Sequence, residues 1–291
     1  MKIIDGKKIR DEILAKVKME VAGLPFQPIF CDILVGDNPT SEQYVRMKAR
    51  YAESVGIKFH SERFVESSTT KDLIEEIRKI NNMKDMCGLI VQLPLPENFN
   101  EQEVLNAVSP NIDVDCLNTK TNELFYRGEG EIKFPTALAC MHILDSLNIE
   151  MVDKSILVIG QGILVGRPVT YLLEEKGLKV DVVISSTEEN IKRELIKNAD
   201  IIISAAGQEK IIKGDMIKPG VVIIDAGTSE SGGGIVGDVD IESIIDIECT
   251  VSPVPGGVGP VTVAMLLNNV LQVAKSRASV DGARHDFAKS I

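Results

Sequence analysis

The sequence predicts an α/β protein with two domains, each built around a parallel β-sheet. Its 291 residues are many for one hydrophobic core and suit two domains of ordinary size. Short apolar runs typical of buried strands alternate with helical patterns along most of the chain, and this alternation is characteristic of parallel sheets covered by helices. A last apolar helix, at about residues 261–274, is expected to return to the first domain.

Three strands and the helices between them account for the first half of the chain. After a short strand or turn and an amphipathic helix at the N-terminus, residues 28–35 form an apolar run that ends in the turn-forming residues 36–39. The spacing then predicts a helix that has Ser41 as its N-cap and stops at Gly56. The remaining elements are a strand at residues 58–64, a helix at 70–82 and a strand at 87–96 that enters a proline-stiffened loop.

The second half contains four more apolar runs, at residues 156–160, 179–185, 199–207 and 220–227, which predict the strands of a second sheet. Residues 118–136 are more polar and less periodic, so we place the crossing between the domains there. The predicted domains are residues 1–118 with 262–285, and residues 119–261. The stretch from about Ser276 is polar, and we expect it to fray.

The composition excludes several classes of protein. Hydrophobic residues make up 44% of the chain and charged residues 26%, which is the ordinary balance of a globular protein. The formal net charge of −11 argues against a nucleic-acid partner, which needs a basic surface. No apolar stretch approaches the ~18 residues of a membrane span, and the N-terminus lacks the apolar core of a signal peptide. We therefore expect a cytoplasmic protein without membrane contact.

Cysteine and histidine usage predicts no metal site. The five cysteines lie far apart without a CxxC pair, and only three histidines are present to join them as ligands. We interpret the cysteines as reduced, buried side chains. His142 and Cys116 are likewise interpreted as structural residues.

A glycine-rich loop follows the strand at residues 156–160. Its glycines have the spacing GxGxxxG, and an apolar helix is expected to begin after it at Val169. Glycine lets the backbone approach a pyrophosphate, and the helix N-terminus supplies oriented N–H donors and about half a positive charge. The spacing also arises for steric reasons alone, but its place between strand and helix favours a Rossmann-like dinucleotide-binding domain. The loop residues expected to bind the cofactor are Gly160, Gln161, Gly162, Val165, Gly166, Arg167 and Pro168.

The ends of the next three strands supply further cofactor-binding candidates, because ligands of such sheets lie at the carboxyl ends of the strands. The first of these ends is hydroxyl-rich and has no carboxylate at its tip, although Glu188 and Glu189 follow. An acidic residue there favours NAD, and a hydroxyl-rich end tolerates the 2′-phosphate of NADP. We therefore expect NADP, with NAD as the alternative. The candidates are Ser185, Ser186, Ala206, Gly207 and Thr228.

A candidate catalytic set lies in the first domain. Tyr44 and Lys48 share one face of a helix, and Gln92 and Asp115, at a strand end and in a loop, are placed to converge on them. Taken singly, Lys48 is more often a solvated lysine and Tyr44 a core or rim residue. Gln92 is more informative, because a buried amide must find a partner or cost about 1–3 kcal/mol. Asp113 and Asp115 fit turn capping as well as function, and one could cap while the other binds a ligand.

Seven blocks follow one another along the sequence: GDNPTSEQYVRMKARYAESVGI, GLIVQLPLP, DVD, GQGILVGRP, IKPGVVIIDAG, VGDVD and SPVPGGVGPVTVAMLLNNV. In this order they closely resemble the methylenetetrahydrofolate dehydrogenase/cyclohydrolase family. The likeness runs from about Lys2 to Ala274, and the stretch PVPGGVGPVTVAML is particularly specific to that family.

The resemblance implies an enzyme of one-carbon metabolism and purine biosynthesis that catalyses two consecutive reactions. The first is the oxidation of 5,10-methylenetetrahydrofolate to 5,10-methenyltetrahydrofolate with NAD(P)+. The second is hydrolysis of that product to 10-formyltetrahydrofolate. The resemblance also implies a homodimer.

Matching of motifs assigns residue roles within this resemblance. Lys48 becomes the central catalytic residue, which handles protons during water attack, and Gln92 becomes the partner that orients it. Tyr44 is implied as an aromatic wall against the folate, and Asp115 as the acceptor for the pterin's amino and ring N–H groups. Thr262 is expected to help cap the last helix. The further substrate-binding residues are Leu93, Pro94, Pro255, Gly256, Gly257, Pro260 and Thr262.

The chain departs from the family's usual pattern beside these residues. The family commonly has a lysine before DVD and a glycine after it, PCTP where this chain reads FPTA, and a serine in the phosphate loop. Two alternatives therefore stay open: a dehydrogenase with weak or absent cyclohydrolase activity, and a non-catalytic nucleotide-sensing regulatory protein. The departures are Ile112, Cys116, Pro135, Ala137 and Gly162.

Overall fold

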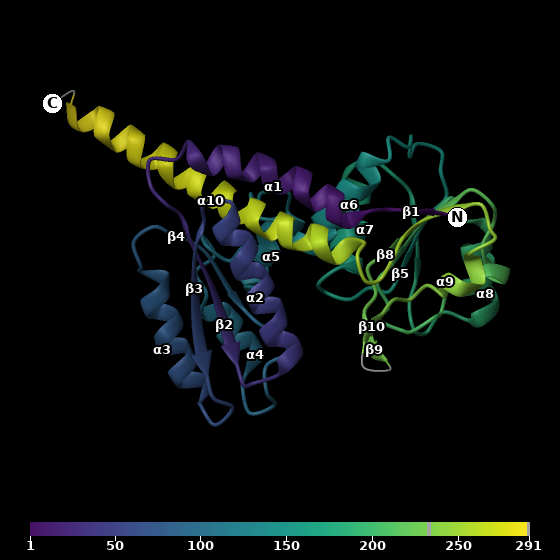
Figure 1. Cartoon of the computed structure of the whole chain (residues 1–291), viewed down its shortest axis with the longest axis horizontal. Helices are drawn as coiled ribbons and strands as arrows, with labels where there is room; N and C mark the ends of the chain where they lie inside the picture. The colour runs from purple at the N-terminus through teal and green to yellow at the C-terminus, as the bar shows by residue number, and fades with distance from the viewer. Residues whose placement is uncertain (232–233, 290–291) are drawn as a thin grey trace. The chain divides into compact units, whose positions relative to one another are not determined.

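A parallel sheet with the strand order β3-β2-β4 carries the first set of predicted site residues (Figure 1). Its members are β2 (Ile29–Val35), β3 (Lys58–Phe64) and β4 (Met86–Val91), which confirms the three strands predicted for the first half of the chain. Leu89 forms a further parallel bridge with Asp113 on the side of β4 away from β2. The sheet therefore aligns the segment around Asp113 with β4.

Helix α2 (Pro39–Ser54) begins earlier than predicted. Its N-cap is Asn38, whose side-chain oxygen accepts a hydrogen bond from the backbone N–H of Ser41 at 3.0 Å, so the prediction of Ser41 as the cap is wrong. Pro39 explains the earlier start, because the first helical turn leaves its N–H groups without intrahelical partners and proline has none. The other helices between the strands and after them are α3 (Thr70–Asn81), α4 (Glu101–Ala107) and α5 (Thr119–Tyr126).

A second sheet of six parallel strands has the order β1-β11-β8-β7-β5-β6. Four of its strands confirm the prediction: β5 (Ile156–Ile159), β6 (Val180–Val183), β7 (Ile201–Ser204) and β8 (Val221–Asp225). The edge strands β1 (Lys2–Ile3) and β11 (Cys249–Ser252) are too short for periodicity to predict their place in the sheet. An antiparallel pair follows β8, formed by β9 (Ser229–Ser231) and β10 (Gly234–Val236).

Strand β5 lies between β6 and β7, so the chain leaves it in one direction along the sheet and later returns on its other side. The loops after β5 and β7 thus meet at a topological switch point, where open α/β sheets bind ligands. Apolar side chains from successive strands, including Leu157, Ile202, Ile223 and Val251, form the core beneath. The helices of this part are α6 (Pro135–Ser146), α7 (Gly166–Glu175), α8 (Glu189–Asn198), the 3-10 helix η1 (Gly214–Met216) and α9 (Ile241–Ile244).

The computed structural model describes residues 1–231 and 234–289, with side chains described through Val280. It divides into two compact units, one of Met1–Asp11 with Thr136–Met265 and the other of Glu12–Pro135 with Leu266–Ile291. Compared with the division predicted from the sequence, residues 1–11 and 262–265 belong with the second sheet and residues 119–135 with the first. Which ligand each unit binds stays a prediction.

Helices α1 (Gly6–Ala22) and α10 (Val258–Lys289) lie side by side, and the parts from Glu12 and from Leu266 onward belong to the unit that contains β2, where Glu20 and Lys275 form an ion pair (Figure 1). The return of the last helix is confirmed, because Asn269 donates to the backbone oxygens of Val114 and Lys133 at 2.9 and 2.7 Å. The stretch from Ser276, which the sequence analysis expected to fray, has a helical backbone to Lys289. Within the described ranges, no helix has the length and apolarity that a membrane crossing demands.

Candidate functional site

Lys48 lies on the buried face of α2. The buried residues of this helix are Val45, Lys48 and Ala52, which share one face by helical spacing. Only 7% of Lys48 is exposed, and a buried ammonium group requires partners that compensate for its lost hydration. It has two: its Nζ donates to Oε1 of Gln92 at 2.7 Å and lies 2.6 Å from Oδ2 of Asp32.

Gln92 follows the last residue of β4, and two hydrogen bonds to backbone carbonyls hold it in place. Its backbone N–H donates to the carbonyl of Ile33 at 2.8 Å, and its Nε2 donates to the carbonyl of Leu93 at 3.2 Å. The amide oxygen is therefore left for Lys48. The prediction that a polar group must face this amide is confirmed.

Asp32 is a site residue that the sequence analysis missed. It occupies the middle of β2, is 0% exposed and forms the ion pair with Lys48. Burial raises the pKa of its carboxyl group, and the charge of Lys48 acts in the opposite direction. The available signal was a lone carboxylate inside an otherwise apolar strand, since such a residue needs a cationic partner nearby.

Of the two aspartates, Asp113 and Asp115, the structure gives the turn-capping role to Asp113. Asp113 is buried and accepts from the backbone N–H groups of Leu117 and Asn118, at 3.3 and 2.9 Å, so it stabilises the turn before α5. Asp115 keeps part of its surface exposed. Burial raises its pKa to about 6, the charge of Lys48 lowers it, and the charges of Asp113 and Asp32 raise it. Of the two carboxylates, Asp115 is thus the partly exposed one, and its role toward a ligand stays a prediction.

The remaining predicted residues of this unit are close in sequence to Lys48 or to Gln92. Tyr44 precedes Lys48 by one helical turn and is 36% exposed. Leu93 is half-buried and Pro94 is exposed, both directly after Gln92. Of the four predicted catalytic residues Tyr44, Lys48, Gln92 and Asp115, Lys48 and Gln92 are joined by a side-chain hydrogen bond.

The glycine-rich loop after β5 has no room for a side chain at two of its positions. Gly160 has a φ of +89°, and a Cβ there would lie 2.5 Å from the carbonyl oxygen of Ala205. A Cβ on Gly166 would lie 2.0 Å from the carbonyl oxygen of Gly160. Gly162 differs, because nothing lies within 4 Å of the Cβ it would carry. Two glycines thus shape the loop, and the third leaves space at its surface.

The other loop residues divide into structural and exposed ones. Gln161 donates to the carbonyl of Gly160 and to Thr170 Oγ1, at 3.1 and 2.9 Å, so its side chain ties the loop to α7. Helix α7 begins at Gly166 and not at the predicted Val169, because the proline at 168 fits the first turn of a helix. Val165 is the N-cap residue, Arg167 is exposed and Pro168 is buried.

The strand-end candidates lie where the sequence predicted, after three strands of the six-stranded sheet, β6, β7 and β8. Ser185 and Ser186 are exposed after β6, Ala206 and Gly207 follow β7, and Thr228 follows β8. All three strands are parallel, so these residues share the carboxyl edge of the sheet with the glycine-rich loop.

Two buried carboxylates that the sequence analysis did not select hold this edge in place. Asp238 accepts from Ser204 Oγ and from the backbone N–H groups of Ala206 and Gln208, at 2.6, 2.8 and 2.8 Å. Asp225 accepts from the backbone N–H groups of Gly227, Asp238 and Val239, at 3.0, 3.2 and 2.9 Å. Burial and then the charge of Asp238 raise the pKa of Asp225 to about 7, while the backbone donors lower it.

The loop before α10 packs on the start of α1. The N–H of Gly6 donates to the carbonyl of Gly256 at 3.1 Å, and a Cβ on Gly6 would lie 1.9 Å from the carbonyl oxygen of Gly257. The expectation that Thr262 caps α10 is wrong, because the helix begins at Val258 and the Thr262 hydroxyl donates to the Val258 carbonyl one turn earlier. The predicted substrate residues Pro255, Gly256, Gly257, Pro260 and Thr262 belong to the unit with the six-stranded sheet.

Both parts of the chain match one protein family. Residues 4–115 match the profile described as tetrahydrofolate dehydrogenase/cyclohydrolase, catalytic domain, and residues 135–278 match that of its NAD(P)-binding domain. A curated relative, the bifunctional protein FolD of Halothermothrix orenii, is 40% identical over 282 residues, which cover 94% of this chain and 98% of the relative.

The chain belongs to the tetrahydrofolate dehydrogenase/cyclohydrolase family.

Solved structures of this family have the same fold. The bifunctional enzyme FolD from Campylobacter jejuni is 34% identical, with a TM-score of 0.90, and the match covers 95% of this chain and 99% of that one. The N5,N10-methylenetetrahydrofolate dehydrogenase-cyclohydrolase of Trypanosoma brucei, solved with NADP cofactor and inhibitor, is 33% identical, with a TM-score of 0.88 and coverage of 94% and 97%. The predicted α/β fold with its Rossmann-like domain is thereby confirmed.

One departure from the family's sequence pattern has a visible backbone consequence. Cys116 has a φ of +63°, in the left-handed region that glycine adopts freely and other residues rarely occupy. The chain thus keeps, directly after Asp115, the conformation that the family's glycine permits. Cys116 is fully buried, and burial raises the pKa of its thiol.

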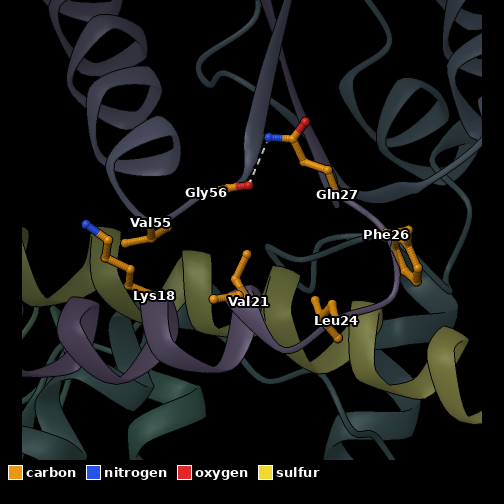
Figure 2. A pocket seen from close by; sticks show the side chains of 8 residues that line it. Lys18, Val21, Leu24, Phe26, Gln27, Val55 and Gly56 are labelled. Atoms are coloured by element: carbon orange, nitrogen blue, oxygen red, sulfur yellow. Dashed lines mark hydrogen bonds between the residues drawn. The ribbon is translucent and has the colours of Figure 1, made fainter.

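A hollow in the tetrahydrofolate dehydrogenase/cyclohydrolase catalytic part lies apart from these residues. It has a volume of about 350 Å³ and is found where the C-terminal ends of α1 and α2 meet the start of β2 (Figure 2). The Gln27 side chain donates to the carbonyl of Gly56 beside it at 3.2 Å. None of the predicted site residues lines it, so we assign it no part in the chemistry. Across the residues with described side chains, no group of three or more His, Cys, Asp or Glu is placed to hold a metal ion.

Proposed function

We propose that this chain oxidises 5,10-methylenetetrahydrofolate to 5,10-methenyltetrahydrofolate with NADP+ and then hydrolyses the product to 10-formyltetrahydrofolate. Membership of the family and the names of its relatives support both reactions. The observation that carries the hydrolytic step is the buried Lys48, with its Nζ 2.7 Å from Gln92 Oε1. We assign the folate contacts of Lys48, Gln92 and Asp115 to the unit with β2, and the dinucleotide to the unit with the six-stranded sheet.

In this proposal each residue acts through the chemistry of its side chain. Lys48 exchanges protons with the attacking water, and Gln92 holds its ammonium group in one orientation. Asp115 accepts hydrogen bonds from the amino and ring N–H groups of the pterin, which a carboxylate receives in pairs. Tyr44 provides an aromatic surface for the folate, beside Leu93 and Pro94.

The glycine-rich loop fits a dinucleotide because its backbone is free of side chains where Gly160 and Gly166 approach neighbouring carbonyls. When bound, the nicotinamide supplies the acceptor for the hydride. The exposed hydroxyls of Ser185 and Ser186, with no carboxylate at the strand tip, favour NADP over NAD.

We therefore expect a lower KM for NADP+ than for NAD+ in the dehydrogenase reaction. Replacing Ser185 by aspartate should reverse this preference, because a carboxylate repels the 2′-phosphate and accepts hydrogen bonds from the free ribose hydroxyl. Steady-state kinetics with both dinucleotides measure the effect. A wild-type enzyme with a lower KM for NAD+ would contradict the assignment.

We also expect the affinity for a folate analogue to fall as the pH is lowered through about 6. The pKa of Asp115 is raised to about 6, so the carboxylate that accepts the pterin's donors is progressively protonated below that pH. The dissociation constant should then rise by about tenfold per pH unit. Calorimetric titration of wild type and Asp115→Asn checks this, since the variant should bind weakly with little dependence on pH. Equal pH dependence in both proteins would assign the titration to another group.

The enzyme is further proposed to be a cytoplasmic homodimer that serves purine biosynthesis. Sedimentation at micromolar concentration tests the dimer. The two alternatives are tested by measuring both half-reactions and the melting temperature with a folate analogue. A regulatory protein predicts no turnover and no folate effect, whereas the enzyme predicts turnover and a dose-dependent rise in melting temperature. A dehydrogenase without hydrolysis is the less favoured outcome, because Lys48 and Gln92 are both present and in contact.

A further inference from the structure

Asp32 occupies a place where a carboxylate is costly. It pairs with Ser61 of β3 and Ile90 of β4 in the middle of the parallel sheet and has no exposed surface. An ionised group there loses its hydration, and only a close cation compensates for the loss. Among the described residues, neither of its oxygens has a polar partner other than Lys48.

Lys48 in turn has one donor more than its partners use. An ammonium group carries three N–H bonds. Gln92 Oε1 accepts from Nζ at 2.7 Å, and Asp32 Oδ2 forms an ion pair with it at 2.6 Å. Even with one N–H bond directed at each of them, a third remains for a further acceptor. Lys48 is therefore a proton donor, Asp32 is a buried proton acceptor beside it, and the neutral amide of Gln92 orients the ammonium group of Lys48.

We propose that Asp32 is the proton partner of Lys48 in the hydrolytic step, taking the ammonium proton so that a neutral amine faces the attacking water. This inference rests on the proposed function and adds a residue to it. Transfer of one proton from Nζ to Oδ2 converts two buried charges into two neutral groups without exchanging a proton with solvent. Burial favours that conversion, because both ions are poorly hydrated in the interior.

The proton steps balance around this pair. An N–H bond of Lys48 breaks and an O–H bond forms on Asp32. Water then adds to the methenyl carbon while one of its protons passes to the amine, and the electron pair of the C=N bond moves to nitrogen. In the collapse to the formyl product, the bond from that carbon to its second nitrogen breaks, and Lys48 returns the proton to this nitrogen. Asp32 gives its proton back to Lys48, and the proton of the added hydroxyl leaves to solvent.

Other titratable groups around the pair set the pH range of the test. Asp115 acts on Lys48 from the segment beside β4, and Asp113 lies two residues before it. The Cys31 thiol neighbours Asp32 on the opposite face of β2, and burial raises its pKa well above its usual range. Because the pKa of Asp115 is about 6, measurements at higher pH see that carboxylate in one ionisation state.

The test compares Asp32→Asn with wild type in both half-reactions. Asparagine keeps the size and the polar contact but accepts no proton. We expect cyclohydrolase kcat to fall about 10²-fold, the usual size of a lost acid–base function, while dehydrogenase kcat stays within a few fold, since hydride transfer releases no proton. From about pH 7 to about pH 9, wild-type cyclohydrolase kcat should be nearly flat, because the proton passes within the pair, whereas kcat of the variant should rise with pH, because the proton must then pass to solvent.

The matched control is Ile33→Val, which trims a buried side chain on the opposite face of β2 and should leave the ratio of the two activities unchanged. A structural role for Asp32 would lower both activities together with an unaltered pH profile, and that result would overturn the inference. If Asp32→Asn fails to fold, the pH profile of the wild type decides alone, because a cyclohydrolase kcat that rises with pH over this range excludes the internal transfer. A Lys48→Met variant that hydrolyses the methenyl compound at the wild-type rate would refute the role of Lys48 in the proposed function. If that variant is inactive but Asp32→Asn behaves as wild type, only the role of Asp32 is refuted.

Discussion

Replacement of Lys48 by methionine is expected to abolish hydrolysis of 5,10-methenyltetrahydrofolate. The side chains are similar in length, but the variant has no group to exchange protons with water, so the rate should drop by at least about 10²-fold. Direct spectrophotometric decay of the methenyl compound measures the loss. The exposed Lys16 on α1 gives the matched control, Lys16→Met, which should retain the wild-type rate.

The fold of the Lys48 variant is expected to survive with a lower melting temperature. Methionine leaves the buried Asp32 without its cation, and the carboxyl group then takes up a proton, since its pKa is already raised by burial. The double variant Lys48→Met with Asp32→Leu should recover much of the lost melting temperature by removing the stranded carboxyl group. A Lys48 variant with wild-type hydrolysis would refute the assignment of this lysine.

The second large effect is expected from Gly166→Ala. A Cβ at this position would lie 2.0 Å from the carbonyl oxygen of Gly160, so the phosphate loop and the start of α7 must move apart. We expect a loss of about 3 kcal/mol in the free energy of unfolding and no measurable NADP+ binding at concentrations that saturate wild type. Thermal unfolding and calorimetric titration measure the two effects.

Gly162→Ala is the control for this substitution. It adds the same methyl group to the same loop, but nothing lies within 4 Å of the new atom. Its stability and NADP+ affinity should remain close to those of wild type. If both alanine variants bind NADP+ equally well, the close approach of Gly166 to Gly160 is not what shapes the loop.

The sequence predicted those parts of the site that depend on local spacing. Lys48 falls at helical intervals from Val45 and Ala52, so its face of α2 was readable, and the buried strand before Gln92 required a polar partner. The glycine-rich loop was equally local, because strand, glycines and helix follow one another within a few residues.

The residues that escaped prediction depend on contacts between distant segments. Asp32 becomes a site residue only because α2 packs on β2 and places Lys48 beside it. The spacing of residues along the sequence does not predict this contact. Asp225 and Asp238 are thirteen residues apart, and they act together only because β7 and β8 are neighbours and the chain returns past β10. Short edge strands such as β11 carry too few residues for a periodic signal.

The Asp225–Asp238 network bears on how a cofactor is received. The two carboxylates fix the backbone after β7 and β8 through hydrogen bonds to six N–H and O–H donors, at Ser204, Ala206, Gln208, Gly227, Asp238 and Val239. Loops already immobilised in this way lose little conformational freedom when a dinucleotide arrives. The rim of the sheet is thus preorganised, and binding energy that would otherwise order a mobile loop remains available as affinity.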